Sequence, residues 1–411
     1  MRRVVVTGIG AVTPIGNSVP EMWEAVKAGK CGIAPITLYD TSEQKVKLAG
    51  EVKNFEPEKV YDKKELRRMD RFTQFAVVAA HEAMNDCGID LDSVDKTRFG
   101  CLVASGIGGL NAIQNEDKRG REKGYDRVMP YFIPMCISNM AAGQIAIRYG
   151  LMGMCSCVVT ACAAGTNAIG DSYRHIKDGY ADMMICGGAE ACITNLGIGG
   201  FTAMQALSAS TDANRASIPF DKERNGFVMA EGAGMLVLEE YEHAKARGAH
   251  IYCELSGYGV NCDAHHVTAP REDGIPAAAC MKMAMDDAGI TPDKIDYINA
   301  HGTSTKLNDK TETKAIRMAF GEYADKLCVS STKSMTGHMI AATGAVEGII
   351  SVLSVVNDYV PATINYQVSD EECDLDIVPN KGREMKVDYA LSNSLGFGGH
   401  NACLAFAPVS V

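Results

Sequence analysis

The sequence predicts an α/β fold built of layers, with sheets that are covered on both faces. Two observations carry this prediction. Short apolar runs rich in valine, isoleucine and cysteine recur along the 411 residues and are separated by helix-like segments, a pattern typical of strands buried between helices. In addition, a short stretch near position 83 returns near position 284, which favours two related halves.

The apolar runs give the predicted strands in chain order. Each run is short enough for a strand and too short for a buried helix. A further strand is expected to begin at Ile251, after the polar segment 239–245. The runs are residues 3–7, 99–104, 155–160, 181–186, 235–238, 297–300 and 328–330.

The repeated stretch lies at the end of a predicted helix in both copies. Residues 83–89 read AMNDCGI, and residues 284–290 read AMDDAGI. In each copy the helix ends at glycine, and an Asp-x-x-Asp pair leads into the next strand. Shared helix-end chemistry could produce part of this likeness. An internal duplication would divide the chain near residues 240–255, and we take residues 1–250 and 251–411 as the two halves.

Composition and charge exclude several classes of protein. The hydrophobic content of 46% is enough for a large core. The formal net charge of −11 disfavours nucleic-acid binding, so an acidic partner would need a local basic patch. The fifteen cysteines lie mostly among apolar neighbours and follow no signal peptide, and no apolar window reaches the length of about 18 residues that spans a membrane. We therefore expect a soluble protein of the reducing cytoplasm.

One cysteine, Cys162, stands out in the stretch VVTACAAGTNAIG. It follows the predicted strand 155–160 and precedes a helix-like segment, so we expect it at a strand-to-helix turn. A helix N-terminus at this point would lower the pKa of the thiol. The small residues around the cysteine would leave room for backbone N–H groups to stabilise an oxyanion. A buried structural cysteine is the alternative, since most cysteines are of that kind.

Two histidines follow predicted strands, at the position where α/β folds place their sites. His301 opens the polar turn HGTST after the strand 297–300. His338 and Lys333 lie in STKSMTGH after the strand 328–330, and Glu347 in the next helix is a suitable ion-pair partner for the lysine. A capping histidine and a structural lysine are the alternatives.

Phe397 lies between glycines in the stretch NSLGFGGHN. Such a backbone can hinge and approach a ligand closely, although a tight turn would look the same. Two weaker motifs carry no function. Gly8 and Gly10 follow a strand, but Thr13 replaces the third glycine of a dinucleotide fingerprint. The CSC stretch at 155–157 lacks the spacing of a zinc site.

Taken together, these stretches resemble the β-ketoacyl-acyl carrier protein synthases of the thiolase superfamily, most closely those of bacterial type II fatty-acid synthesis. The likeness spans the chain from VVVTGIGAVTPIG through PFDKERNGFVMAEGAGMLVLEE to NSLGFGGHNA, and STKSMTGH within a Cys-His-His order is a highly specific motif. The resemblance implies a thiolase-like fold in which two duplicated βαβαβαββ halves give a five-layered αβαβα architecture.

The resemblance also implies an acyltransferase that elongates acyl chains. An acyl group moves from the carrier to a cysteine, a malonyl thioester loses carbon dioxide, and the enolate attacks the acyl-cysteine to give a 3-oxoacyl chain two carbons longer. This reaction requires no metal or redox cofactor. The expected partner is acyl carrier protein, loaded with acyl or malonyl groups, and the expected assembly is a homodimer.

Catalytic roles follow from the resemblance residue by residue. Cys162 matches the acyl-accepting nucleophile. His301 and His338 match the two histidines that serve decarboxylation and condensation. Lys333 matches the lysine that orders this network, and Glu347 stands at the matching acidic position.

Further matches concern the path of the substrate. Phe397 matches an aromatic gatekeeper whose backbone N–H joins that of Cys162 in the oxyanion hole. Thr303 and Thr305 match threonines that hydrogen-bond the phosphopantetheine arm, and Ile107 matches a residue that lines the acyl pocket near the subunit interface.

A positive stripe lies on an otherwise acidic chain, at helical spacings on one predicted helix. A solvated charged face is the usual explanation for such a run. The resemblance instead implies that Lys64, Arg67 and Arg68 dock the acidic carrier protein. The stripe consists of Lys63, Lys64, Arg67, Arg68 and Arg71.

A few positions depart from the family pattern, and some rival functions remain. Leu395, His400 and the pair at 306–307 differ near the gate and the arm entrance, so the chain-length preference is open.

A polyketide ketosynthase subunit keeps the same Cys-His-His set and stays an alternative. A thiolase would carry a Cys-x-Gly, which Cys403 does not form, and a starter enzyme would replace one histidine with asparagine. A non-catalytic chain-length scaffold would lack the nucleophile.

Overall fold

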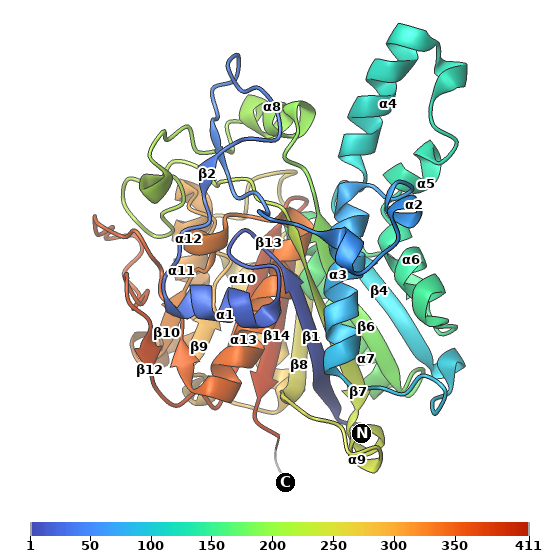
Figure 1. Cartoon of the computed structure of the whole chain (residues 1–411). Coiled ribbons are helices and arrows are strands. Elements are labelled where there is room, and N and C mark those ends of the chain that lie inside the picture. Colours follow the sequence, from blue (N-terminus) through green and yellow to red (C-terminus); the bar gives the residue numbers. More distant parts are fainter. Residues whose placement is uncertain (1, 410–411) are drawn as a thin grey trace.

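A ten-stranded mixed sheet runs through the molecule, which the computed structural model describes from residue 2 to residue 409. Its strands lie in the order β10-β9-β13-β14-β8-β1-β7-β6-β4-β5 (Figure 1). The pairing of β1 with β8 joins two sets of five strands. Counted outward from this junction, the two sets place their strands in the same chain order. The predicted division near residue 250 would fall at this junction and stays a prediction.

Each set has the same mixture of strand directions. The three strands farthest from the junction run parallel, and the other neighbours pair antiparallel. The first set contains β1 (Val4–Val12), β4 (Phe99–Ala104), β5 (Cys155–Ser156), β6 (Met183–Glu190) and β7 (Gly232–Glu240). The second set contains β8 (Cys253–Cys262), β9 (Tyr297–Asn299), β10 (Cys328–Ser330), β13 (Ala390–Gly396) and β14 (His400–Ala407).

Helices form three layers around the two sets of strands. Two helices pack on the outer face of the first set and two on the outer face of the second. Another two pack against each other between the sets. The predicted five-layered αβαβα architecture is thereby confirmed. In layer order, the helices are α3 (Arg71–Asp86) and α6 (Met140–Tyr149), then α7 (Ala164–Lys177) and α13 (Thr343–Asn357), then α10 (Ile275–Ala288) and α11 (Lys306–Phe320).

The remaining elements are insertions and connections. The helix α4 (Leu110–Lys123) stands clear of the layered body in Figure 1. The other helices are α1 (Val19–Lys27), α2 (Lys63–Leu66), α5 (Phe132–Cys136), α8 (Asn195–Ala203), α9 (Tyr241–Ala246) and α12 (Lys333–Thr336). The short strands pair as β2 (Ala34–Pro35) with β3 (Leu48–Ala49), and as β11 (Tyr359–Val360) with β12 (Arg383–Glu384).

Glycines let the outer helices approach β1 and β8 closely. A Cβ at Gly10 would lie 2.0 Å from the carbonyl oxygen of Ala79 in α3. A Cβ at Gly259 would lie 2.1 Å from the carbonyl oxygen of Cys280 in α10. The Gly8-x-Gly10 motif therefore serves helix packing, and the second half repeats it.

Most of the predicted strands are present, and β4 and β10 have the predicted bounds. The run 155–160 is different. Only Cys155–Ser156 pairs with β4, and both of its residues are exposed. The prediction of a buried strand at 155–160 was wrong, because this run lies at the free edge of the sheet.

One helical stretch, Ile340–Asn357, is long and apolar enough to cross a membrane, but 89% of it is buried inside the protein. It contains α13, the helix of the middle layer. A helix that is covered on all sides by protein is apolar all round, so its composition follows from its place in the core.

Candidate active site

Cys162 lies in the turn η4 (Ala161–Ala163), which leads directly into α7. The thiol is therefore at a helix start, as predicted, although an irregular segment rather than a strand precedes it. Ala161 has a φ of 51°, in the left-handed region that L-residues seldom adopt. A Cβ at Gly165 would lie 2.3 Å from the carbonyl oxygen of Ala341. This glycine lets α7 pack against the segment that follows His338.

The glycine-rich loop reaches the Cys162 turn from the end of β13. A Cβ at Gly396 would lie 2.7 Å from the carbonyl oxygen of Thr160 and 3.3 Å from the backbone nitrogen of Cys162. The backbone N–H of Phe397 acts on the sulfur as a hydrogen-bond donor. Two backbone N–H groups, from Cys162 and Phe397, are thus close to the thiol, which is the arrangement an oxyanion hole needs.

Burial decides the ionisation of the thiol in the resting protein. Cys162 is only 7% exposed, and the loss of hydration raises the pKa of its thiol to about 11. The charge of Lys333 and the N–H of Phe397 act in the opposite direction without offsetting the burial. The prediction of a lowered pKa was therefore wrong for the resting state. The thiol is neutral at pH 7.

His301 follows β9, at the carboxyl end of the strand. Its backbone N–H donates to Glu312 Oε1 at 2.8 Å, and the N–H of Gly302 donates to Glu312 Oε2 at 2.7 Å. Glu312 comes from α11, and burial raises the pKa of its carboxyl. This carboxyl group holds the backbone from which the imidazole of His301 projects.

Lys333 and Glu347 form a buried ion pair next to the histidines. The Nζ of Lys333 donates to Glu347 Oε1 at 2.6 Å, and the two side chains are 1% and 2% exposed. The expected pairing is therefore present. Removing either partner would leave a buried charge without its counterion, which is costly.

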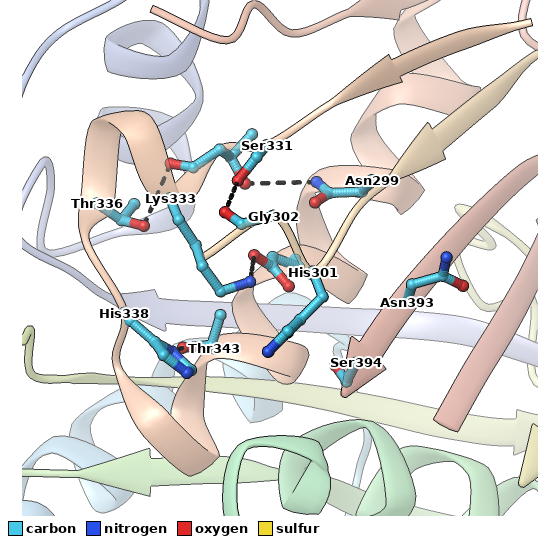
Figure 2. Close-up of polar contacts among 12 residues, drawn as sticks. Asn299, His301, Gly302, Ser331, Lys333, Thr336, His338, Thr343, Asn393 and Ser394 are labelled. Atoms are coloured by element: carbon cyan, nitrogen blue, oxygen red, sulfur yellow. Dashed lines mark hydrogen bonds and ion pairs between the residues drawn. The ribbon is translucent and has the colours of Figure 1, made fainter. Parts of the chain in front are cut away.

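The rings of His301 and His338 meet edge to face, with centroids 5.4 Å apart and planes at 86°. Figure 2 shows the two rings pointing toward one another, with the Lys333 side chain beside them and its ammonium directed at the carboxylate of Glu347. His338 Nδ1 lies 3.0 Å from Thr343 Oγ1, and its Nε2 has no hydrogen-bond partner among residues 2–409. Burial, followed by the charge of Lys333, holds the pKa of both imidazoles well below the usual value. Both rings are neutral at pH 7, and each can donate one N–H.

A cavity of about 560 Å³ collects these groups. The hydroxyls of Thr303 and Thr305 lie 2.9 Å apart on its wall. In the described part of the chain, no group of three or more His, Cys, Asp or Glu side chains is placed to hold a metal ion. The sequence-predicted residues that line the cavity are Cys162, His301, Thr303, Thr305, His338 and Phe397, together with the divergent Lys306, Leu307 and Leu395.

Ile107 lies outside this cavity. It is half-buried and packs in a cluster with Phe201, Phe227 and Ile340. The ring of Phe201 is 6.4 Å from that of Phe397, measured between centroids. Phe227 belongs to this cluster and also lines the cavity, so the two adjoin. The role of Ile107 in an acyl pocket stays a prediction.

The basic residues do not share one helix, contrary to the prediction. Lys64 lies in α2, Arg67 and Arg68 lie in the turn after it, and all three are exposed. Arg71 begins α3, and its guanidinium bonds both oxygens of the buried Glu231 at 2.6 and 2.9 Å. Arg71 is therefore a structural residue and does not belong to the exposed basic patch.

Sequence reasoning missed Glu312, Thr343 and Arg224. Glu312 and Thr343 touch the backbone or ring of a predicted histidine, and Arg224 bonds carbonyls of the HGTST loop. Glu312 had one available signal, since it lies in the helix that follows HGTST. Arg224 lies in the PFDKERNGF stretch of the family resemblance, but its partners are distant in sequence and the stretch did not indicate the contact.

Two family models match this chain. One, described as beta-ketoacyl synthase, N-terminal domain, matches residues 1–244, and the C-terminal domain matches residues 252–367. The chain belongs to the β-ketoacyl synthase family. Its curated relatives include the 3-oxoacyl-[acyl-carrier-protein] synthase 2 of Synechocystis sp., 50% identical over 406 residues, and that of Staphylococcus aureus strain COL, 52% identical over 405 residues. Each of these alignments covers 98% of both chains.

Solved structures of β-ketoacyl synthases have the same fold. A β-ketoacyl synthase from Burkholderia phymatum superposes with a TM-score of 0.92 at 34% identity. The ketosynthase of a type II polyketide synthase, solved with its acyl-carrier protein, gives 0.92 at 38%, and the ishigamide ketosynthase/chain length factor gives 0.94 at 36%. All three comparisons cover 100% of both chains.

Proposed function

We propose that this β-ketoacyl synthase is an elongating condensing enzyme of type II fatty-acid synthesis, an acyltransferase that joins malonyl carrier protein to an acyl-cysteine. The observation that carries the proposal is the meeting of one thiol, two neutral imidazoles and two backbone N–H groups at one cavity. This set suits a reaction in which a thioester oxygen gains negative charge.

The first step is acyl transfer to Cys162. The sulfur attacks the thioester carbonyl of the acyl carrier, and the oxyanion is stabilised by the N–H groups of Cys162 and Phe397. The carrier thiol leaves, and the proton of the Cys162 thiol ends on it. Because the resting thiol is neutral, ionisation belongs to this step.

The second step is decarboxylation of a malonyl thioester. The bond between the carboxylate and the α-carbon breaks, and its electron pair forms an enolate whose charge lies on the thioester oxygen. His301 and His338 donate N–H groups to that oxygen. Neutral donors are suitable, because this step removes carbon dioxide and no carbon-bound proton. The ion pair of Lys333 and Glu347 keeps a fixed positive charge beside both rings.

The third step forms the new carbon–carbon bond. The enolate carbon attacks the carbonyl of the acyl-Cys162 thioester, again at the two backbone N–H groups. The Cys162 sulfur leaves with the electron pair and takes up a proton from solvent. The product is a 3-oxoacyl carrier thioester two carbons longer, and the thiol is ready for another acyl group.

A polyketide ketosynthase is the second candidate, because it uses the same Cys-His-His set. One similar solved structure is described as a type II polyketide ketosynthase, at 38% identity, and another as a ketosynthase/chain length factor, at 36%. The curated fatty-acid synthases are at 50–52% identity over nearly the whole chain. This difference favours the fatty-acid reaction.

The partner that we propose is acyl carrier protein, and the location is the cytoplasm. A solved relative is described as a complex of a ketosynthase with its acyl-carrier protein. Lys64, Arg67 and Arg68 form an exposed basic patch on a chain of net charge −11. Such a patch attracts a strongly acidic protein and speeds encounter.

The nucleophile assignment is tested with Cys162→Ala. We expect the condensation of acyl and malonyl carrier thioesters to fall by about 10³-fold or more, because no covalent acyl intermediate can form. Mass spectrometry of wild-type protein mixed with acyl carriers of several chain lengths is expected to place the acyl group on Cys162. Full condensation by the alanine variant would refute the assignment.

The docking patch is tested by reversing two charges, Arg67→Glu and Arg68→Glu together. The KM for acyl carrier protein is expected to rise about tenfold at low salt and less at high salt, where charges are screened. Reaction with a small acyl thioester serves as the control and should stay unchanged. Equal losses on both substrates would show that the patch does not dock the carrier.

A further inference from the structure

An irregular segment, residues 217–230, bridges the two loops that carry the histidines. It connects the insertion around α8 to β7 and contains the motif PFDKERNGF, to which the reaction steps above give no role. Apart from Lys222, Glu223 and Asn225, the residues of this segment are buried. Buried backbone without regular structure must find other hydrogen-bond partners. Residues 217–230 have these hydrogen-bond partners in the two loops that carry the histidines.

Its contacts to the Lys333 and His338 loop lie at both ends of the segment. The hydroxyl of Ser217 donates to the carbonyl of Lys333 at 2.7 Å. The N–H of His338 donates to the carbonyl of Val228 at 2.7 Å, and the N–H of Ala230 donates to the carbonyl of His338 at 2.8 Å. The segment thus holds the backbone on both sides of the imidazole of His338.

Its contacts to the HGTST loop centre on Ser304. The N–H of Ile218 donates to Ser304 Oγ at 2.9 Å, and the N–H of Gly226 donates to the carbonyl of Ser304 at 3.1 Å. Ser304 has a φ of 68°, in the left-handed region. A non-glycine residue adopts this conformation only where surrounding contacts stabilise it. The 217–230 segment supplies these contacts to Ser304, which lies between Thr303 and Thr305.

The guanidinium of Arg224 also bonds this loop. Its Nε donates to the carbonyl of Thr305 at 3.2 Å, and its Nη2 donates to the carbonyl of Lys306 at 3.0 Å. Its side chain is 2% exposed, and it also pairs with the carboxylates of Asp309 and Asp370 at 3.4 and 2.5 Å. A planar fork of donors can bond several acceptors at fixed angles, whereas a lysine ammonium cannot.

We propose that Arg224 is a positioning residue for the carrier's phosphopantetheine arm, and that it acts by fixing the loop from Thr303 to Lys306. The two carbonyls it holds belong to the successive peptides on either side of Lys306. Their position sets where the Thr303 and Thr305 hydroxyls stand on the cavity wall. The inference rests on the proposed function, because it assigns those hydroxyls to the arm.

The proposal is tested by comparing Arg224→Lys with Arg247→Lys. Arg247 is a matched control, because it bonds the carboxylate of Glu239 and the carbonyl of Cys87 and does not line the cavity. We expect Arg224→Lys to raise the KM for acyl carrier protein by about tenfold, since a small displacement of a positioning group is costly. The control is expected to stay within about twofold of wild type.

A second substrate separates positioning from general damage. A p-nitrophenyl acyl ester has no pantetheine arm, and release of nitrophenolate reports acylation of Cys162. We expect this rate to change by less than about twofold in Arg224→Lys. Equal losses with the ester and the carrier substrate would overturn the proposal, and so would an unchanged KM for the carrier.

A double-mutant cycle shows whether Arg224 acts through the threonines. If it does, Arg224→Lys adds little to the KM increase already caused by Thr303→Ala with Thr305→Ala, because neighbours that share one function are not additive. Fully additive effects would contradict the proposal. If Arg224→Lys does not fold, Ser304→Ala removes the bond from Ile218 and should give the same split between substrates. A wild-type protein that fails to condense carrier thioesters would refute the proposed function instead.

Discussion

At Cys162, two charges of opposite sign act on one thiol. Lys333 lowers the pKa of the thiol, and the carboxylate of Glu190 raises it, while burial has the largest effect. Glu190 is fully buried at the end of β6 and accepts bonds from the Ser105 hydroxyl and the Gly106 N–H at 3.0 and 2.7 Å. Among residues 2–409, no cationic side chain forms an ion pair with Glu190. The residue therefore combines a structural contact with an electrostatic effect on the nucleophile.

Glu190→Gln is expected to make the thiol more acidic. Removing a negative charge favours the thiolate, so the pKa of Cys162 falls and a larger fraction is ionised at any pH below it. The measurement is the pH dependence of Cys162 alkylation by iodoacetamide. We expect the profile to move to lower pH and the rate at pH 8 to rise by about twofold or more.

Glu122→Gln, in an exposed part of α4, is the matched control for that experiment. Its alkylation profile should coincide with that of the wild type. A Glu190→Gln profile that stays in place or moves to higher pH would show that the field of Glu190 does not reach the sulfur.

At the scale of elements, the two halves share the same close contacts between an outer helix and a strand. The residues that repeat in sequence, Ala83 and Ala284, face Gly8 and Gly257 at equivalent places, where a Cβ would come within 2.3 and 2.2 Å of their carbonyl oxygens. The repeated helix ends therefore mark a packing requirement that the two halves share.

Gly259→Ala is expected to cost about 3 kcal/mol of stability, because α10 must move away from β8 to admit the methyl group. Gly199→Ala in α8 is the control, since nothing lies within 4 Å of a Cβ there and alanine favours a helix. Thermal unfolding measures both. A Gly259→Ala protein that melts at the wild-type temperature would contradict the close approach.

The sequence predicted most of the apolar strands but missed β13, whose buried residues are partly polar, and also the apolar β14. In β13, Ser392, Asn393 and Ser394 are all buried, with Ser394 Oγ 2.7 Å from Thr166 Oγ1. The predicted apolar runs did not include these residues. The opposite error occurred at 155–160, where apolar residues indicated burial and the chain left them at an edge. Local composition does not encode which polar group finds a distant partner.

The same limit applies to the site. Cys162, His301, Lys333 and His338 could be found because each belongs to a recognisable motif next to a strand or helix start. Arg224 could not be found, because its partners at Thr305 and Lys306 are backbone carbonyls. Every residue carries a backbone carbonyl, so no pattern of side chains in the sequence indicates this contact.

At the scale of the whole molecule, several large apolar side chains are exposed near the free edge of the sheet. The strand β5 ends the sheet there with an unpaired edge, and α6 packs beside it. An open edge with apolar neighbours invites pairing with a second copy. The exposed apolar side chains of this region are Ile133 (59%), Ile137 (40%), Ile147 (75%), Met152 (65%) and Val159 (55%).

We expect a homodimer through this face, and Ile147→Asp with Met152→Asp is expected to disrupt it. Two charges placed in an apolar interface lose hydration without gaining a partner. Sedimentation velocity should show wild-type dimer and variant monomer at the same concentration. Val356→Asp, at an exposed site at the end of α13, should leave the dimer intact. A variant that remains dimeric would place the interface elsewhere.

The two halves contribute different residues to one active site, which matters while the chain is being synthesised. The thiol of Cys162 belongs to the first half, whereas both histidines and Phe397 belong to the second. On the ribosome, the cysteine therefore emerges long before the groups that activate it. We expect a partly synthesised chain to hold an ordinary thiol that captures acyl groups from carriers only once the β13–β14 hairpin has been made.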